Sequence, residues 1–375
     1  MIKSENFVNC LKKNNINFYT GVPDSLFADL CHTFQIKEKK KHILATNEGA
    51  ALGMAIGYFL STKKVPLVYL QNSGLGNIIN PLLSLVDKKI FNIPIFFLIG
   101  WRGEIIKKKQ IKDEPQHKKQ GAVTTKLLKI LDIKTQILHA NSDFKKIIKN
   151  LKLYAQKYNK PVAILIRKNS FKKIKFIYKK KNSNQCTREM ALKEVFQHLP
   201  KNIPKISTTG MLSRELYEIN KIENCQKNTF MTIGGMGHAV SIATGIGFAK
   251  NKKKIICLDG DGSALMHLGS LANSAKIKNL VHIVFNNFAH DSVGGHVPPS
   301  EKINFTKLAK NIGYSNSYKI QNIKNIKSKI KLALKNQKST FIEIICVKGH
   351  RNNLSRPKKN AVYYKKIFMK FLKKC

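Results

Sequence analysis

Long apolar segments are missing from this sequence. No uninterrupted apolar run reaches the roughly 18 residues that a membrane-spanning helix needs, and the densest run, residues 93–101, has the length of a core strand. The N-terminal stretch MIKSENFVNCLKKNN contains an acid and several amides but no apolar region typical of a signal peptide. We therefore expect neither a membrane segment nor a secretory leader.

Cysteine is sparse and forms no pattern. The seven cysteines are odd in number, scattered, and never arranged as CxxC; they stand at positions 10, 31, 186, 225, 257, 346 and 375. Two of them, Cys257 and Cys346, lie inside apolar runs. This usage argues against a disulfide framework and predicts reduced thiols in a cytoplasmic protein.

Arginine and acidic residues are also few, whereas lysine is abundant. Lys and Arg together number 68 against 21 Asp and Glu, which gives a formal net charge of +47. Such a charge suggests a nucleic-acid partner, but only six of the basic residues are arginines, the residues that read DNA bases by bidentate contacts. The lysines are spread along the whole chain, so we expect salt-sensitive binding to polyanions and no specific nucleic-acid function.

Strand-like apolar runs alternate with helix-like segments along the chain. Examples are HILAT followed by EGAALGMAIGYFL, and KKIICLDG followed by SALMHLGSLANSA. This alternation predicts α/β domains with doubly wound parallel sheets, and 375 residues that are 43% hydrophobic suffice for two of them. The basic segment KNSFKKIKFIYKKKNSNQC has little pattern. We expect domains at 1–168 and 187–375 with a linker at 169–186.

Polar residues follow two neighbouring strand-like runs in the second half. The run KIICL ends at Asp-Gly-Asp-Gly, and VHIVF ends at an Asn-Asn pair about 25 residues later. Parallel strands place such ends at one edge of the sheet, where these folds bind ligands, so Asp261 and Asn287 are candidate oxygen ligands for Mg²⁺. Gly260, Gly262 and Ser263, which is predicted to open a helix, suit the approach of a phosphate. The alternative is two ordinary turns that bind nothing.

The GDG and NN spacing resembles the diphosphate-binding motif of thiamine diphosphate (ThDP) enzymes. The resemblance implies that Asp261, Asn287 and the backbone carbonyl of Ala289 bind Mg²⁺. It also requires a glutamate that shares a proton with the aminopyrimidine ring, and Glu48, between a strand-like run and a small-residue helix, fits that role. A carboxylate that only complements the helix dipole is the alternative for Glu48.

Two further segments suit the cofactor by the same resemblance. GGMGHAVSIATGIGFA matches the part of the family that cradles the pyrimidine ring, with Gly234, Gly235 and Met236 as contacts. QNSGLGN in the first half provides Asn72 and Gly74. For Met236 the alternative is an ordinary core position.

The resemblance extends to the phosphonopyruvate decarboxylase family over almost the full chain. Five stretches carry it: TGVPDSLF (20–27), QNSGLGN (71–77), GWRGE with DEPQHKKQG (100–104 and 113–121), STTGMLSREL (207–216) and AHDSVGG (289–295). It implies a pyrimidine-binding and a diphosphate-binding domain of the ThDP fold without the middle domain of larger relatives. It also implies a homodimer or higher homo-oligomer, because the two domains face each other across subunits in such enzymes.

Polar groups on these stretches suit an anionic keto acid. The candidate substrate contacts are Asp24, Ser25, His117, Arg351 and Arg356, and the candidate catalytic residues are Glu48, His117 and His290. A helix N-cap at Asp24 and Ser25, and surface positions for His117, Arg351 and Arg356, are the alternatives.

The resemblance implies ThDP- and Mg²⁺-dependent, non-oxidative decarboxylation of 3-phosphonopyruvate to phosphonoacetaldehyde in phosphonate biosynthesis. Sulfopyruvate decarboxylase is the nearest alternative, although it often divides the two halves between separate chains. A ThDP-fold binding protein without catalysis and a basic polyanion binder are alternatives from other classes. The chain departs from the family pattern at Phe288, His296 and Ser355, which concerns substrate placement rather than cofactor binding.

Overall fold

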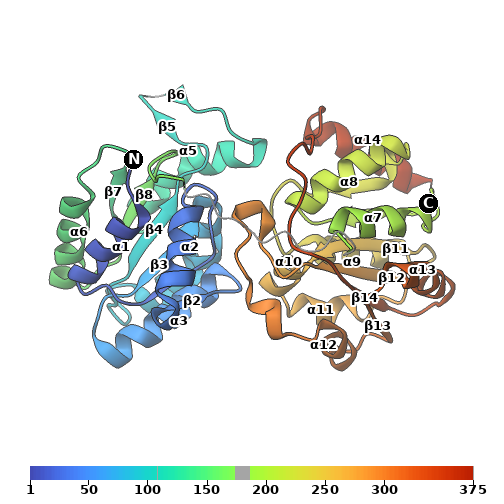
Figure 1. Ribbon diagram of the computed structural model, residues 1–375, viewed down its shortest axis with the longest axis horizontal. Coiled ribbons are helices and arrows are strands. Elements are labelled where there is room, and N and C mark those ends of the chain that lie inside the picture. The colour runs from blue at the N-terminus through green and yellow to red at the C-terminus, as the bar shows by residue number, and fades with distance from the viewer. Residues whose placement is uncertain (108, 174–185, 375) are drawn as a thin grey trace. The chain divides into compact units, whose positions relative to one another are not determined.

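The computed structural model describes residues 1–107, 109–173 and 186–374, and the chain divides into two compact units, within residues 1–177 and within 178–375 (Figure 1). We call them the N-terminal unit and the C-terminal unit. Each contains a sheet of six parallel strands with helices on both faces, so the predicted pair of doubly wound α/β domains is confirmed. The centre of the predicted linker, residues 174–185, lies outside the described residues, and the exact domain limits stay a prediction.

The N-terminal unit has the strand order β2-β1-β3-β4-β8-β7. Its strands are β1 (Tyr19–Gly21), β2 (His42–Leu44), β3 (Leu67–Gln71), β4 (Phe96–Gly100), β7 (Lys134–Leu138) and β8 (Val162–Ile166), and an antiparallel hairpin adds β5 (Ile105–Ile106) and β6 (Lys109–Gln110). Its helices are α1 (Ser4–Lys13), α2 (Ala28–Lys37), α3 (Glu48–Thr62), α4 (Leu75–Pro81), α5 (Pro115–Ile130) and α6 (Phe144–Tyr158).

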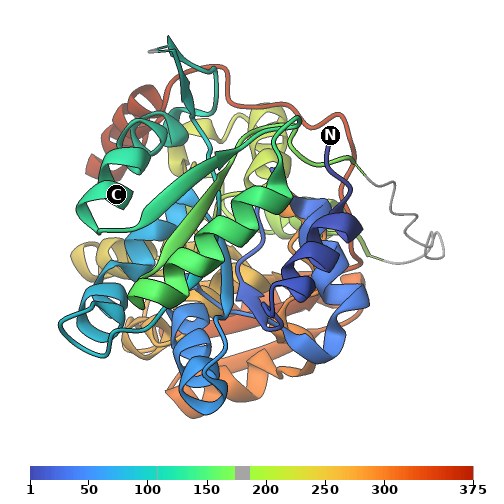
Figure 2. The ribbon, with the colours of Figure 1, turned by 90° about the vertical axis from the view of Figure 1, so that its left-hand side faces the viewer.

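Apolar side chains on both faces of these strands bury the N-terminal sheet. Neighbouring residues of a strand point to opposite faces, so Phe96 and Leu98 pack with α1, α2 and α6, whereas Phe97 and Ile99 pack with α3, α4 and α5. Figure 2 shows α6 and α1, in green and dark blue, side by side across the first of these faces. A strand buried on both faces reads as a continuous apolar run, which is why β4 was predictable.

The C-terminal unit has the strand order β10-β9-β11-β12-β14-β13. Its strands are β9 (Lys205–Ser207), β10 (Thr229–Met231), β11 (Ile255–Gly260), β12 (Leu280–Asn286), β13 (Asn316–Ile320) and β14 (Thr340–Ile345). Its helices are α7 (Arg188–Gln197), α8 (Met211–Ile222), α9 (Ala239–Ala249), α10 (Asp261–Met266), α11 (Ser270–Ser274), α12 (Phe305–Ile312), α13 (Ile326–Lys335) and α14 (Ala361–Lys373). Figure 1 shows α7 and α8 on one side of this sheet and α11 and α12 on the other.

The sheet registers bring the candidate site residues to strand ends. In the C-terminal unit Gly260 of β11 pairs with Phe285 of β12, so Asp261 and Asn287 emerge at the same edge. In the N-terminal unit β1, β3 and β4 are neighbours and end at one edge. Each unit therefore presents its polar motifs at the carboxyl ends of its strands, as the sequence predicted.

Some elements differ from the sequence expectation. The edge strands β7, β10 and β13 were not predicted, because KTQIL and NSYKI are mostly not buried and TFM is only three residues long. The segment predicted as one helix after Gly260 forms two short ones, α10 and α11, and the first begins at Asp261 rather than at Ser263. At the start of the predicted linker, Phe171 is 3% exposed and packs in the N-terminal core.

No helix in the described part of the chain is both long enough and apolar enough to cross a membrane.

Candidate active site

Glu48 lies at the start of α3 in a closely fitted pocket. Its side chain is 5% exposed, and its Oε2 accepts a hydrogen bond of 2.7 Å from Asn77 Nδ2. The cap of α3 is provided by Asn47, whose side chain accepts from the N–H of Ala50 at 2.8 Å. Asn47 therefore caps α3, and the Glu48 carboxylate is not needed as its cap.

Gly74 makes room for the Glu48 carboxylate. A Cβ on Gly74 would stand 2.6 Å from Glu48 Cδ and 2.7 Å from Cγ, distances that real side chains do not adopt. Asn72, two residues earlier, is buried and donates through Nδ2 to Arg102 O and Thr124 Oγ1, both at 2.9 Å. These bonds use both N–H groups of the Asn72 amide, and its Oδ1 accepts from the N–H of Arg102 at 3.2 Å, so its predicted cofactor contact is left to its backbone.

Asp24 is a fully buried carboxylate after β1. Its Oδ1 accepts from the N–H of Leu26 and its Oδ2 from Gln71 Nε2, both at 2.6 Å. Gly100 admits it at the end of β4, because a Cβ there would lie 2.6 Å from Oδ1. Burial raises the pKa of Asp24, although these hydrogen bonds and nearby positive charge oppose the shift. The N-cap of α2 is Phe27, so Asp24 does not fill that position.

An arginine–aspartate–histidine cluster adjoins Asp24. Arg102 donates from Nε and Nη2 to Asp113 at 2.8 and 2.5 Å, and from Nη1 to Ser25 Oγ at 3.1 Å. His117, which is 7% exposed, places Nδ1 3.0 Å from Asp113 Oδ1. Burial alone would raise the pKa of Asp113, but hydrogen bonds from Arg102, His117 and two backbone N–H groups outweigh it and lower the pKa.

The structure thus brings together three of the predicted substrate residues: Asp24, Ser25 and His117. Arg102 and Asp113 had no predicted role, although both lie in stretches that carry the family resemblance. Only Asp113 had a local signal, because it stands just before α5 and four residues before His117, a spacing at which side chains meet.

Asp261, the predicted metal ligand, is a buried carboxylate of the C-terminal unit. It is 2% exposed, and its Oδ2 accepts a hydrogen bond of 2.7 Å from Ser300 Oγ. Burial raises the pKa of Asp261 to about 6, although hydrogen bonds from Ser300 and the Gly262 backbone oppose the shift. The positive charge of Arg188 also opposes the shift but acts less than burial does, so the chemistry of this carboxylate fits a divalent cation.

His290 packs directly beside this turn. A Cβ on Gly262 would lie 2.7 Å from His290 Nδ1, so only glycine allows the imidazole to approach the Asp261 turn. Burial lowers the pKa of His290 to about 4, with Asp291 opposing the shift. His290 is therefore neutral at pH 7 in this structure.

Ser263 connects the Asp261 turn to the glycine-rich loop. Its Oγ lies 2.8 Å from Thr208 Oγ1 and accepts from the N–H of Gly237 at 3.1 Å. Gly235 and Gly237 have φ values of +64° and +91°, which favour glycine. Met236 between them is partly exposed and belongs to neither core cluster of this unit, which does not support the core alternative.

The Asn-Asn pair lies at the end of β12, with Asn286 as its last residue and Asn287 at the start of the following loop. Asn287 is 3% exposed and donates from Nδ2 to Asp291 Oδ2 at 2.6 Å. Phe288 has a φ of +53°, unusual for a non-glycine residue, and Asn286 Oδ1 accepts from its N–H at 3.2 Å. The following Ala289, predicted to present its carbonyl, is 7% exposed.

The two C-terminal arginines have different surroundings. Arg351 donates from Nε to both carboxylate oxygens of Glu189, at 3.1 and 3.0 Å, and also pairs with Glu218. These ion pairs favour a structural role for Arg351 over a free anion contact. Arg356 is exposed.

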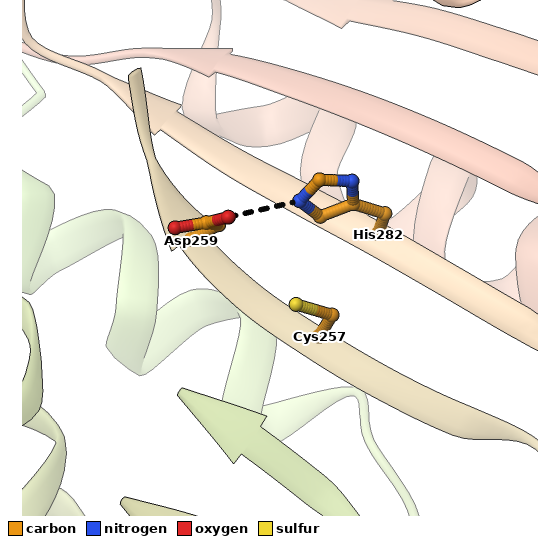
Figure 3. Close-up of side chains that lie close together, drawn as sticks. All are labelled: Cys257, Asp259 and His282. Atoms are coloured by element: carbon orange, nitrogen blue, oxygen red, sulfur yellow. Dashed lines mark hydrogen bonds and ion pairs between the residues drawn. The ribbon is translucent and has the colours of Figure 1, made fainter. Parts of the chain in front are cut away.

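A second polar cluster lies inside the C-terminal sheet, on β11 and β12 (Figure 3). Cys257, Asp259 and His282 are each fully buried, with His282 Nε2 3.3 Å from Asp259 Oδ2 and His282 Nδ1 3.3 Å from Tyr314 OH. Burial raises the pKa of the Cys257 thiol well above its ordinary value. Both ring nitrogens of His282 therefore already have partners. The two acids of the Asp-Gly-Asp-Gly turn also differ in position, because Asp259 lies in the core and Asp261 at the carboxyl ends of the strands.

Comparison with known proteins places both units in one family. Residues 3–125 match the thiamine pyrophosphate enzyme, N-terminal TPP binding domain, and residues 206–344 match the C-terminal TPP binding domain. The chain belongs to the thiamine pyrophosphate enzymes. Its relatives show further that it is a thiamine diphosphate-dependent decarboxylase.

The chain is similar to several decarboxylases, three of which differ in organism, identity and coverage. The chain is 27% identical to phosphonopyruvate decarboxylase of Streptomyces viridochromogenes, over 99% of this chain and 95% of that one. It is 36% identical to sulfopyruvate decarboxylase subunit alpha of Methanocaldococcus jannaschii, over 42% and 88%. It is 24% identical to sulfopyruvate decarboxylase of Methanosarcina acetivorans, over 93% and 92%. Since the last of these aligns along nearly its whole length, a single chain does not by itself favour phosphonopyruvate.

Proposed function

We propose that this decarboxylase converts 3-phosphonopyruvate to phosphonoacetaldehyde and CO₂, with ThDP and Mg²⁺, as a step in phosphonate biosynthesis. The observation that supports it most is the alignment with the phosphonopyruvate decarboxylase of S. viridochromogenes over 99% of the chain. Every predicted motif lies within that span.

The C-terminal unit would hold the metal and the diphosphate. The buried carboxylate of Asp261, the amide oxygen of Asn287 and the carbonyl of Ala289 are hard oxygen donors that suit Mg²⁺. Gly260, Gly262 and Ser263 would accept the diphosphate, and the loop 234–236 would hold the ring. When bound, ThDP supplies a carbon nucleophile for the ketone and an acceptor for the electrons released with CO₂.

The N-terminal unit would provide groups that share or donate protons in the reaction. Glu48, held by Asn77, would share a proton with the aminopyrimidine ring. Because a proton replaces CO₂ in the product, an acid must also stand near the substrate carbon. Asp24, whose pKa is raised by burial, and His117 are the candidates for this acid in the N-terminal unit. His290 in the other unit is neutral at pH 7 and would instead accept or pass on a proton.

The phosphonate requires positive or hydrogen-bonding groups. Ser25, Arg351 and Arg356 are the proposed contacts, of which Arg351 would first have to leave its two glutamates. Arg102 is neutralised by Asp113, so we assign it to the support of the site rather than to the phosphonate.

We also propose a homodimer or higher homo-oligomer. Helix α3 presents Gly53 and Gly57 on an exposed face. Apart from the adjoining residues and nearby backbone of α3, a Cβ added at either position would have no atom of the described residues within 4 Å. Glycine inside a helix costs about 1 kcal/mol relative to alanine, and close approach of another helix would offset that cost. Light scattering after size-exclusion chromatography tests this proposal, and a monomer at micromolar concentration would refute it.

Sulfopyruvate is the second candidate substrate, because two relatives are sulfopyruvate decarboxylases. The two acids differ in the charge of the terminal group, since a phosphonate carries a second ionisation near neutral pH. Incubation of the purified protein with phosphonopyruvate, ThDP and Mg²⁺, followed by phosphorus NMR, tests the first proposal. Appearance of phosphonoacetaldehyde that depends on both additions supports it, and unchanged substrate refutes it.

A further inference from the structure

A buried array of charges lies behind the Asn287 loop. It consists of Arg188 at the start of α7, Glu215 in α8 and Asp291 after β12, and their side chains are 6%, 1% and 5% exposed. Arg188 donates from Nε and Nη2 to Glu215 at 2.7 and 2.9 Å, and from Nη1 to Asp291 Oδ2 at 2.9 Å. One guanidinium thus joins two helices to the loop.

The array ends on the amide of Asn287. Asp291 Oδ2, the oxygen that Arg188 binds, also accepts the 2.6 Å hydrogen bond from Asn287 Nδ2. Because this oxygen accepts hydrogen bonds from both Arg188 and Asn287, the NH₂ group of the Asn287 amide must face Asp291. The carbonyl oxygen Oδ1 of Asn287 must then point the other way.

The preceding asparagine is held in the same manner for a different purpose. Asn286 Nδ2 donates to Glu343 Oε1 at 2.8 Å, and its Oδ1 accepts from the N–H of Phe288. Its amide therefore joins Glu343 of β14 to the loop, and its Oδ1 supports the positive φ of Phe288. In Asn287 the corresponding hydrogen bond fixes the amide and leaves Oδ1 for a ligand.

Stability alone does not explain this arrangement. Replacement of a buried ion array by well-packed apolar residues is often neutral or stabilising, because three charges must be desolvated. Such an array does provide a fixed geometry, since Arg188 is anchored by two hydrogen bonds to a carboxylate on another helix. A fixed geometry matters most where the array meets a metal ligand.

We propose that Asp291, held by the Arg188–Glu215 pair, is a positioning residue that orients the Asn287 amide so that Oδ1 binds the divalent cation. The inference rests on the proposed Mg²⁺ site. It assigns a task to parts of two motifs, STTGMLSREL and AHDSVGG, that the proposed chemistry does not otherwise use.

Binding of Mn²⁺ to the full-length protein with ThDP, followed by electron paramagnetic resonance, tests the inference without turnover. Asp291→Ala is expected to weaken Mn²⁺ binding about 10- to 100-fold, as removal of partners behind metal ligands does. Asp291→Asn keeps an oxygen that can accept from both Asn287 and Arg188, so most of the affinity should remain. The matched control is Glu194→Gln on α7, which replaces the carboxylate in contact with His198 outside the array. This variant should bind Mn²⁺ within twofold of wild type.

A double-substitution cycle distinguishes positioning from a general structural effect. If Asp291 acts through Asn287, Asp291→Ala should add nothing to the loss caused by Asn287→Ala. Additive losses, or a folded Asp291→Ala protein that binds Mn²⁺ as wild type does, would overturn the inference. The inference would also be overturned if Asp291→Asn bound Mn²⁺ as weakly as Asn287→Ala does. Absence of Mn²⁺ binding in the wild type would instead refute the proposed metal site itself.

Discussion

Replacement of Gly74 by alanine perturbs the Glu48 carboxylate although Glu48 itself is not substituted. The backbone of Gly74 has φ −75° and ψ −8°, which alanine adopts without strain. The new Cβ, however, would lie 2.6 Å from Glu48 Cδ and 2.7 Å from Cγ. Since carbon atoms in contact are about 3.5–4.0 Å apart, the carboxylate must retreat by about 1 Å.

A displacement of about 1 Å at a catalytic group can cost about 100-fold in rate, which corresponds to about 2.7 kcal/mol of activation free energy. We therefore expect Gly74→Ala to lose about 100-fold in kcat while it remains folded, because the Glu48 side chain can move. The assay is initial-rate CO₂ release with saturating ThDP and Mg²⁺, together with thermal unfolding.

Gly76→Ala is the matched control. Gly76 is exposed, and a Cβ added there would have no side chain or distant backbone of the described residues within 4 Å. Alanine should stabilise α4 slightly there and leave kcat unchanged. If Gly74→Ala and Gly76→Ala both turn over within twofold of wild type, the Glu48 carboxylate does not act from the position described.

Three other predictions concern single residues of the two units. Glu48→Gln should retain ThDP, measured by equilibrium dialysis, and lose most turnover; undiminished turnover would remove Glu48 from the reaction. Asp261→Ala should abolish Mg²⁺-dependent ThDP retention without lowering the melting temperature, because it removes a buried carboxylate, and retention equal to wild type would refute the metal assignment. Burial lowers the pKa of Lys205 to about 8 in the folded protein, so the unfolded chain binds that proton more tightly. The charged lysine therefore destabilises the fold fully below pH 8. This destabilisation decreases as the pH rises to about 10. Lys205→Met should therefore raise the free energy of unfolding by about 1–3 kcal/mol at pH 7, with a smaller gain at pH 9.5 in urea titrations; an equal gain at both values would contradict the cause.

The sequence predicted those features that depend on residues close to one another along the chain. Central strands such as β4 and β11 are buried on both faces and read as apolar runs, and the polar residues that follow β11 and β12 necessarily meet at one sheet edge. The edge strands β7 and β13 escaped prediction because their residues are mostly not buried and include polar side chains, and β10 because it is only three residues long.

The supporting residues of the site were not predictable for a different reason. Arg188 lies 103 residues from Asp291, and Ser300 lies 39 residues from Asp261, so no local pattern connects them. The carboxylate pockets behind Gly74 and Gly100 likewise depend on the packing of separate strands and helices. Only Asp113, one helical turn before His117, had a local signal.

The most direct measurement is the rate of CO₂ release by the purified protein, with ThDP and Mg²⁺, from phosphonopyruvate, sulfopyruvate and pyruvate in parallel. We predict the highest kcat/KM for phosphonopyruvate, and the weakest use of pyruvate because it lacks the second anionic group. A preference for sulfopyruvate or pyruvate, or no release from any of the three acids, would contradict the proposed function.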